Sequence, residues 1–60
     1  MSSDYTERLY FIALNVRAED KIVRKRLSPD FFEAKNAQRA CERLRQKQPK
    51  AYVVEQVRFL

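Results

Sequence analysis

The sequence predicts an α+β fold, a single small domain with the order strand–strand–helix–strand. Residues 9–16 alternate as a half-buried strand does, and small apolar residues recur at helical spacing within residues 29–48. Residues 51–60 are rich in valine and aromatic residues, which favour strands. We expect a three-stranded sheet, an antiparallel hairpin plus the C-terminal strand, with the helix packed on one face. Residues 1–7 are expected to form a flexible tail, and residues 8–60 the β-β-α-β domain.

The first two strands are predicted to pair as a hairpin. The face of the first strand expected to meet the core carries Tyr10, Ile12, Leu14 and Val16. With residues 19–20 at the tip, the second strand covers residues 22–27 and Val23 lies opposite Val16. A slip by one residue would turn two arginines into the core, so this register is favoured. The tip lacks an Asn-Gly or Asp-Gly pair, so a longer type I loop is the alternative. Lys25 falls on the core face, which requires a sheet edge or a bulge.

The helix is predicted to follow the hairpin after a short connection. Ser28 suits the N-cap position with Pro29 as the first helical residue. The alternative is Asp30 as N-cap with Glu33 three residues later. Pro49 disfavours helical conformation at the residue before it, so the helix is expected to end near that point. The stripe expected to face the sheet consists mainly of small residues: Ala34, Ala37, Ala40, Cys41 and Leu44.

The composition narrows the chemistry that the chain can perform. It contains no glycine, no histidine and one cysteine. Ordinary zinc and haem sites, His-based acid–base catalysis and an intrachain disulfide are therefore excluded. Without glycine, phosphate-binding loops and dinucleotide-binding turns are excluded as well. We expect no catalytic residue, no metal and no cofactor, and hence a binding module that is not an enzyme.

The sequence also predicts that the protein does not enter a membrane. The longest apolar run covers residues 9–14, whereas a membrane-spanning helix needs about 20 apolar residues. Residues 1–4 lack the basic and apolar segments of a signal peptide. We therefore expect a cytoplasmic location.

Positive charge is concentrated in the second strand and the helix. The net charge is +5, but residues 21–50 hold ten basic residues against three acidic ones, a net of +7. On the helix, cations recur every four residues on the side away from the small-residue stripe. On the sheet, Arg17, Arg24 and Arg26 are expected to share a face with Phe11. The candidate partner-binding residues are Arg24, Arg26, Phe32, Lys35, Arg39, Arg43, Lys47 and Arg58.

Each of these features also has a structural interpretation. The basic side of the helix can be an ordinary solvated surface, because Lys and Arg are good helix formers. Phe11 and Tyr52 can pack against arginine side chains or a second subunit instead of stacking on nucleic-acid bases. Phe32 can anchor an interface, or it can close with Phe31 over the end of the sheet where the helix begins.

The uneven charge leads to three hypotheses about function. The favoured one is a module that binds an acidic protein surface through its basic helix or sheet face. The alternative is a nucleic-acid-binding protein whose second strand and helix contact phosphates. The third is a small structural subunit or a homodimer, because a short three-stranded sheet has unpaired edges and little core.

Three stretches carry a resemblance to a known family. They are Phe11-Ile12-Ala13 followed by Val16, the helix residues Ala34 and Ala37, and Tyr52-Val53-Val54-Glu55-Gln56-Val57-Arg58. This layout resembles small phage-encoded host-takeover proteins, such as the T7-type inhibitors of bacterial RNA polymerase. The resemblance implies the strand–strand–helix–strand fold and a phage or prophage regulator that binds a host protein, with Arg58 as a contact. The inhibitor is acidic whereas this chain is basic, so the family's target is not carried over.

Overall fold

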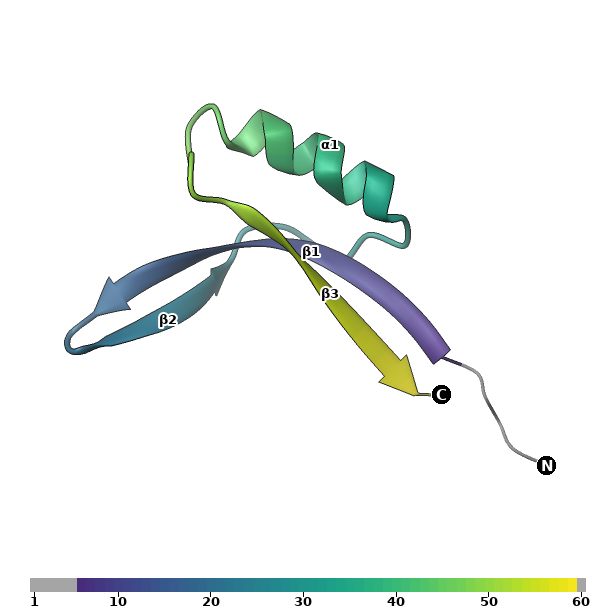
Figure 1. Cartoon of the computed structure of the whole chain (residues 1–60), viewed down its shortest axis with the longest axis horizontal. Coiled ribbons are helices and arrows are strands. Elements are labelled where there is room, and N and C mark those ends of the chain that lie inside the picture. Colours follow the sequence, from purple (N-terminus) through teal and green to yellow (C-terminus); the bar gives the residue numbers. More distant parts are fainter. Residues whose placement is uncertain (1–5, 60) are drawn as a thin grey trace.

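The computed structural model describes residues 6–59 of the chain. Over these residues it contains three strands in one open antiparallel sheet and one helix (Figure 1). The elements are β1 (Thr6–Ala18), β2 (Lys21–Arg26), α1 (Ala34–Leu44) and β3 (Tyr52–Phe59). The strand order is β2-β1-β3, so the first strand lies in the middle of the sheet. The predicted α+β fold is confirmed.

The hairpin has the register that the sequence favours. Val16 lies opposite Val23, and Leu14 lies opposite Lys25. Ala18 pairs with Lys21, so the loop has two residues, and the longer loop considered as an alternative is wrong. This short loop requires strained backbone at Glu19, whose φ of 56° lies in the left-handed region that favours glycine. Lys25 needs no bulge, because β2 is an edge strand and the lysine is exposed.

The central strand β1 is longer than predicted, and its two halves pair with different strands. It pairs with β3 over residues 6–13 and with β2 over residues 13–18. Of the segment expected to be a tail, residues 1–5 lie outside the described residues. Thr6 and Glu7, in contrast, pair with the end of β3 and belong to the sheet. Leu60, predicted at the end of the third strand, is also outside the described range.

The segment after β2 continues along β1 instead of starting a helix. The Leu27 N–H donates to the Ile12 carbonyl at 2.8 Å, and the Ser28 hydroxyl accepts from the Ile12 N–H at 2.8 Å. Phe31 then forms a two-way bridge with Tyr10. The predicted helix start at Ser28 or Asp30 is therefore wrong, because residues 27–31 form hydrogen bonds with the backbone of β1 instead of a helical turn.

The helix is shorter than predicted at both ends. Glu33 is the N-cap residue and forms no side-chain capping bond. At the other end, the N–H groups of Lys47 and Gln48 donate to the Leu44 carbonyl and close a turn ahead of Pro49. The stripe that faces the sheet is the predicted one: Ala34, Ala37, Ala40, Cys41 and Leu44 are its buried or half-buried residues. Small side chains let α1 lie close to the strands.

The main core lies between α1 and the sheet. Ile12, Cys41 and Ala51 form its centre, and they are surrounded by half-buried apolar residues: Leu27, Phe31, Ala40, Leu44 and Val53. The face of β1 predicted to meet the helix is the correct one, but only Ile12 on it is fully buried, whereas Leu14 and Val16 are half-buried.

The opposite face of β1 is buried more than the sequence suggested. Leu9 is 3% exposed, Phe11 is 4% exposed and Ala13 is fully buried, although α1 lies on the other side of the sheet. Figure 1 shows that β1 is arched, with α1 over the outer side of the bend. These three side chains are on the inner side, where the strand is flanked by β3 on one edge and by residues 27–31 on the other.

Candidate interaction surfaces

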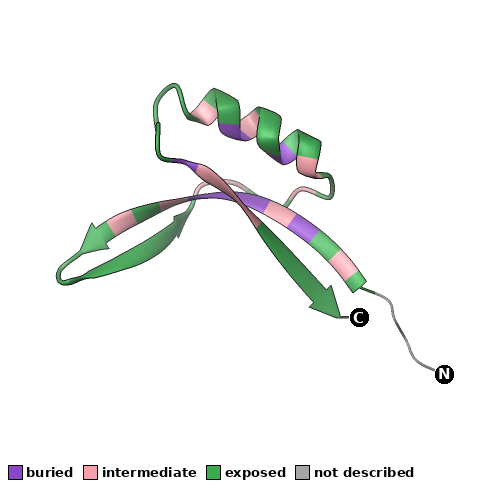
Figure 2. Ribbon diagram, in the orientation of Figure 1, coloured by how far each residue is buried: buried purple, intermediate pink, exposed green. Residues whose placement is uncertain are grey.

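The hairpin projects from the fold as a two-stranded ribbon, which we define as residues 14–26. α1 packs against β1 and β3 and not against β2. β3 begins at Tyr52 opposite Ala13, so β1 has no β3 neighbour within the ribbon. All six residues of β2 are exposed, including Ile22 at 70%, and β2 is coloured as exposed along its whole length in Figure 2. The ribbon is therefore supported by the rest of the described chain only at its base.

Cations lie on both faces of the ribbon. Lys21 and Lys25 share the face of Val16, and Arg24 shares the opposite face with Arg17, as the register requires. Within residues 6–59, four of the ribbon's cations form no ion pair: Arg17, Lys21, Arg24 and Lys25. Val23 is exposed on the face of Lys21 and Lys25, and Ile22 is exposed on the face of Arg17 and Arg24, so each face has one exposed large apolar side chain among its cations. The ribbon therefore presents apolar surface framed by positive charge, with the acidic pair Glu19 and Asp20 at its tip.

Arg26 differs from the other cations because its guanidinium is engaged within the chain. It lies over the Phe11 ring, 4.6 Å from the ring centroid. Its Nε donates to the Ser28 carbonyl at 2.7 Å, and its terminal nitrogen pairs with the Asp30 carboxylate. The structural interpretation of Phe11 therefore holds, since an arginine covers the ring. Arg26 stays a predicted partner contact, but its first role is to close this face of the sheet.

The outer side of α1 carries the predicted row of cations. Lys35, Arg39 and Arg43 are exposed and lie on the side opposite the buried Ala37 and Cys41. Lys47 lies in the turn that follows the helix, so the row continues past its end in a different conformation. Lys35 is 3.7 Å from Glu33, whereas Arg39 and Arg43 have no ion-pair partner among the described residues.

The two remaining candidates lie away from the ribbon and from the outer side of α1. Phe32 is 75% exposed, while its neighbour Phe31 packs against the core. The two phenylalanines therefore behave differently, and only Phe31 closes over the sheet. Arg58 lies near the end of β3 opposite Glu7, on the same face as Phe11. The candidate residues thus form separate surfaces and not a single site.

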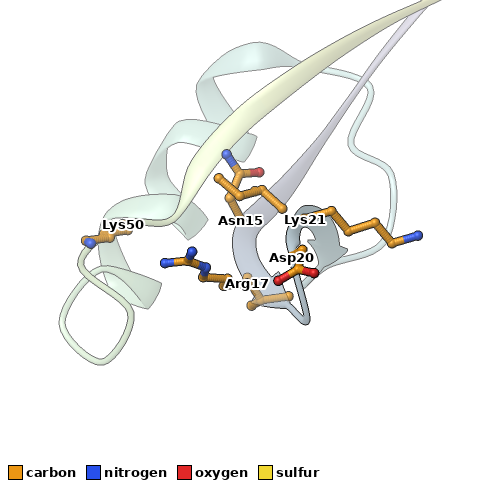
Figure 3. A pocket seen from close by; sticks show the side chains of 7 residues that line it. Asn15, Arg17, Asp20, Lys21 and Lys50 are labelled. Atoms are coloured by element: carbon orange, nitrogen blue, oxygen red, sulfur yellow. The ribbon is translucent and has the colours of Figure 1, made fainter.

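An open pocket of about 520 Å³ lies beside the ribbon, and we call it the edge pocket. It is lined by three cations, one carboxylate and three further residues of the ribbon: Arg17, Lys21 and Lys50, Asp20, and Asn15, Val16 and Ile22. In Figure 3 the Arg17 guanidinium extends toward the loop that carries Lys50, while Lys21 extends in the opposite direction. The sequence pattern predicted Arg17 on this part of the sheet. Lys50 reaches the pocket because the loop before β3 brings it there. That loop is closed by a hydrogen bond from the Ala51 N–H to the Gln48 carbonyl at 3.0 Å. The position of Lys50 depends on this turn, so the periodicity of the sequence does not predict it.

The described residues contain neither a grouping of side chains suited to hold a metal ion nor a helix with the length and apolar character needed to cross a membrane. Comparison of the chain with protein-family models, curated proteins and solved structures finds no match.

Proposed function

We propose that this protein is a small basic interaction module, without enzymatic activity, that binds an acidic surface of another protein. The ribbon carries the proposal. A two-stranded hairpin is marginally stable in water by itself, yet this one projects with all of β2 exposed and with two large apolar side chains, Ile22 and Val23, facing solvent. A bound partner would cover the apolar side chain on the ribbon face that it contacts and pair with the cations around it.

Two observations favour a protein partner over nucleic acid. The exposed Ile22 and Val23 lie among the cations, where phosphates would gain nothing from contact with them. The sheet ring that the sequence suggested for base stacking, Phe11, is buried and covered by Arg26. Apolar surface surrounded by positive charge suits a protein surface that has an apolar centre and acidic borders.

The proposal extends to a regulator encoded by a phage or prophage that modulates a host protein. Its support is the resemblance noted in the sequence, carried by the strand around Ala13 and by the last strand ending at Arg58. The order of strands and helix in the structure is the one that this resemblance implies. The basic ribbon supplies a contact surface that such a regulator would need.

Affinity capture from bacterial lysate, with and without nuclease, tests the proposal. The decisive comparison is between two double charge reversals of equal net change, Arg24→Glu with Lys25→Glu and Arg39→Glu with Arg43→Glu. Capture by the ribbon variant should fall at least tenfold, since opposed charges are lost at the contact itself. The helix variant should retain more binding. Any decrease in its capture measures the contribution of the outer side of α1 to binding.

Equal losses in the two variants would show that only net charge matters, and the ribbon would then not be the contact element. Unchanged capture by the helix variant would identify the outer side of α1 as an ordinary solvated surface. Circular dichroism of both variants checks that each retains the fold.

Nucleic-acid binding is the second candidate, and the cations on both faces of the ribbon favour it. A two-stranded ribbon fits the major groove, where phosphates lie on both sides. Binding of this kind weakens steeply with salt, with a slope that counts the neutralised phosphates. Gel shifts at low salt with duplex DNA, single-stranded DNA and RNA decide the matter, and no binding to any probe excludes this candidate.

A further inference from the structure

Within the ribbon, one edge of the central strand has no neighbouring strand among the residues that the structure describes. β3 accompanies β1 from Thr6 to Ala13 and does not extend further, because its first residue, Tyr52, lies opposite Ala13. Had the ladder continued, Lys50 would lie opposite Asn15. The chain instead turns away ahead of Ala51, through the hydrogen bond to the Gln48 carbonyl.

The direction of the backbone groups on this edge follows from the hydrogen bonds along β1. The N–H and carbonyl of Tyr10 bond to Phe31, and the Ile12 carbonyl accepts from Leu27, so even-numbered residues face the β2 side. Successive residues of a regular antiparallel strand face opposite edges. The two ladders of β1 continue without a bulge. The N–H and carbonyl groups of Asn15 and Arg17 therefore face the edge that β3 leaves free.

The edge pocket includes the two residues of this free edge, Asn15 and Arg17, extends over the tip and β2 to Asp20, Lys21 and Ile22, and is open to solvent. Arg17 and Lys50 lie toward one side of it, and neither has an ion-pair partner among residues 6–59. The Asn15 side chain is fixed, because its Oδ1 accepts from the Tyr52 hydroxyl at 2.6 Å. The free edge thus combines backbone groups without a partner among the described residues, an open pocket beside them, and two cations, Arg17 and Lys50, against the single carboxylate of Asp20.

We propose that an extended acidic segment of the bound protein adds as a strand to β1 at Asn15 and Arg17. This inference rests on the proposed function and specifies how the partner is held. Backbone hydrogen bonds to the free edge supply affinity, and carboxylates of the segment meet Arg17 and Lys50. The segment occupies the place that a longer β3 would fill.

The outer edge of β2 is the other place where a strand could add. Its outward backbone groups belong to Ile22 and Arg24, by the same alternation. The edge pocket is lined by both strands, since Lys21 and Ile22 of β2 line it together with Asn15, Val16 and Arg17 of β1, so it does not by itself separate the two edges. Lys50 does separate them, because it lies on the Arg17 side of the pocket, away from Lys21 (Figure 3). Long cationic side chains along an edge strand, here Lys21 and Lys25, are a common means of discouraging strand addition. The β1 edge is therefore the better site.

A proline substitution can test the backbone contact directly. The Arg17 N–H faces the free edge and not β2, and proline is tolerated in strands where the missing N–H points to solvent. Arg17→Ala removes the charge alone, whereas Arg17→Pro removes the charge and the N–H donor. The comparison between the two variants therefore isolates the backbone hydrogen bond.

The probe is an acetylated and amidated hexapeptide of alternating valine and glutamate, and the control is its valine–lysine counterpart. In the full chain, amide exchange followed by NMR should slow at Asn15 and Arg17 when the acidic peptide is added. The valine–lysine peptide should leave these amides unchanged. Arg17→Pro should bind the acidic peptide about fivefold to tenfold more weakly than Arg17→Ala, as expected for one lost hydrogen bond.

Several results would overturn the inference. They are slowed exchange at Ile22 and Arg24 instead, equal affinity of the two Arg17 variants, or no binding of the peptide at millimolar concentration. Protection of Asn15 and Arg17 that grows with protein concentration in the absence of peptide would assign the edge to a second copy of the chain. If any of these is found while the ribbon double variant still loses its captured protein, the proposed function stands and the added strand is wrong.

Discussion

Arg26 shows how one residue can determine the surface of a sheet. Its guanidinium covers Phe11, bonds to the Ser28 carbonyl and pairs with Asp30, so it joins β2, β1 and the connection that follows. Arg24, two residues earlier on the same face, has no such contacts among the described residues. The two arginines are indistinguishable in the sequence pattern, because their difference depends on where the chain goes after β2.

Replacing Arg26 should therefore destabilise the fold, while replacing Arg24 should not. We expect Arg26→Ala to lower the free energy of unfolding by about 1–2 kcal/mol, from the lost cation–π contact, hydrogen bond and ion pair. Arg24→Ala should change it by no more than about 0.5 kcal/mol. Urea denaturation of both variants measures this difference, and equal stabilities would contradict the role given to Arg26.

The hairpin tip offers a second test at the residue scale. Glu19 adopts a positive φ of 56°, which costs a residue with a Cβ atom about 1–2 kcal/mol. Glycine avoids this cost but loses more backbone entropy on folding. We expect Glu19→Gly to stabilise the protein by a few tenths to about 1 kcal/mol. Asp20→Gly, where φ is not positive, should be neutral or destabilising in the same thermal melts, and a Glu19→Gly variant that melts earlier than the native chain would be inconsistent with this geometry.

Among the elements, the helix was predicted well along its buried stripe and poorly at its start. The stripe from Ala34 to Leu44 follows from helical periodicity alone. The start does not, because Ser28 has the local pattern of an N-cap but uses its hydroxyl to accept the Ile12 N–H. That bond depends on Ile12 lying alongside residue 28, which is a tertiary arrangement. The strand register agrees with the prediction but not for the reason assumed, because every residue of β2 is exposed and a slip would bury no arginine. The two-residue loop between Ala18 and Lys21 sets the register.

The close packing of α1 on the sheet depends on small side chains. Ala37 is fully buried, and it faces the strands together with Cys41. Ala37→Leu should force the helix outward and destabilise the fold by about 1–3 kcal/mol. Gln38→Leu, at the next and exposed position, is the matched control and should have little effect on thermal stability. Equal effects would mean that the helix does not lie as close to the sheet as described.

The whole molecule is thin and extended for its length. Its extents are 47 × 29 × 12 Å, and its radius of gyration is 13.9 Å, compared with about 10 Å for a compact domain of this length. Figure 1 shows the reason, since the ribbon and the paired ends of β1 and β3 extend in opposite directions from the helix. The sequence indicated positive charge in the second strand but not that this strand would project, because projection depends on how far β3 extends along β1.

This shape leads to a prediction about local stability. Amides of Leu9 and Phe11, which face β3 in the centre of the fold, should exchange at least tenfold more slowly than those of Val16 and Val23 in the ribbon. Native-state hydrogen exchange measures this directly. Sedimentation at micromolar concentration should show a monomer with an elongated shape. A stable dimer, or ribbon amides as protected as the centre, would indicate that a second copy of the chain covers the ribbon.

Because β1 pairs with two different strands, its two halves become paired at different times during synthesis. Only residues 19–20 separate β1 from β2, so the hairpin can close soon after residue 26 leaves the ribosome. The other half of β1 must wait for β3, because Phe11 pairs with Val54 and Leu9 pairs with Gln56. At roughly 5–20 residues per second, that wait is on the order of seconds. During it, Leu9 and Phe11 remain on an unpaired apolar edge, the kind of segment at which nascent chains associate. The stage of synthesis most prone to aggregation therefore ends when β3 emerges.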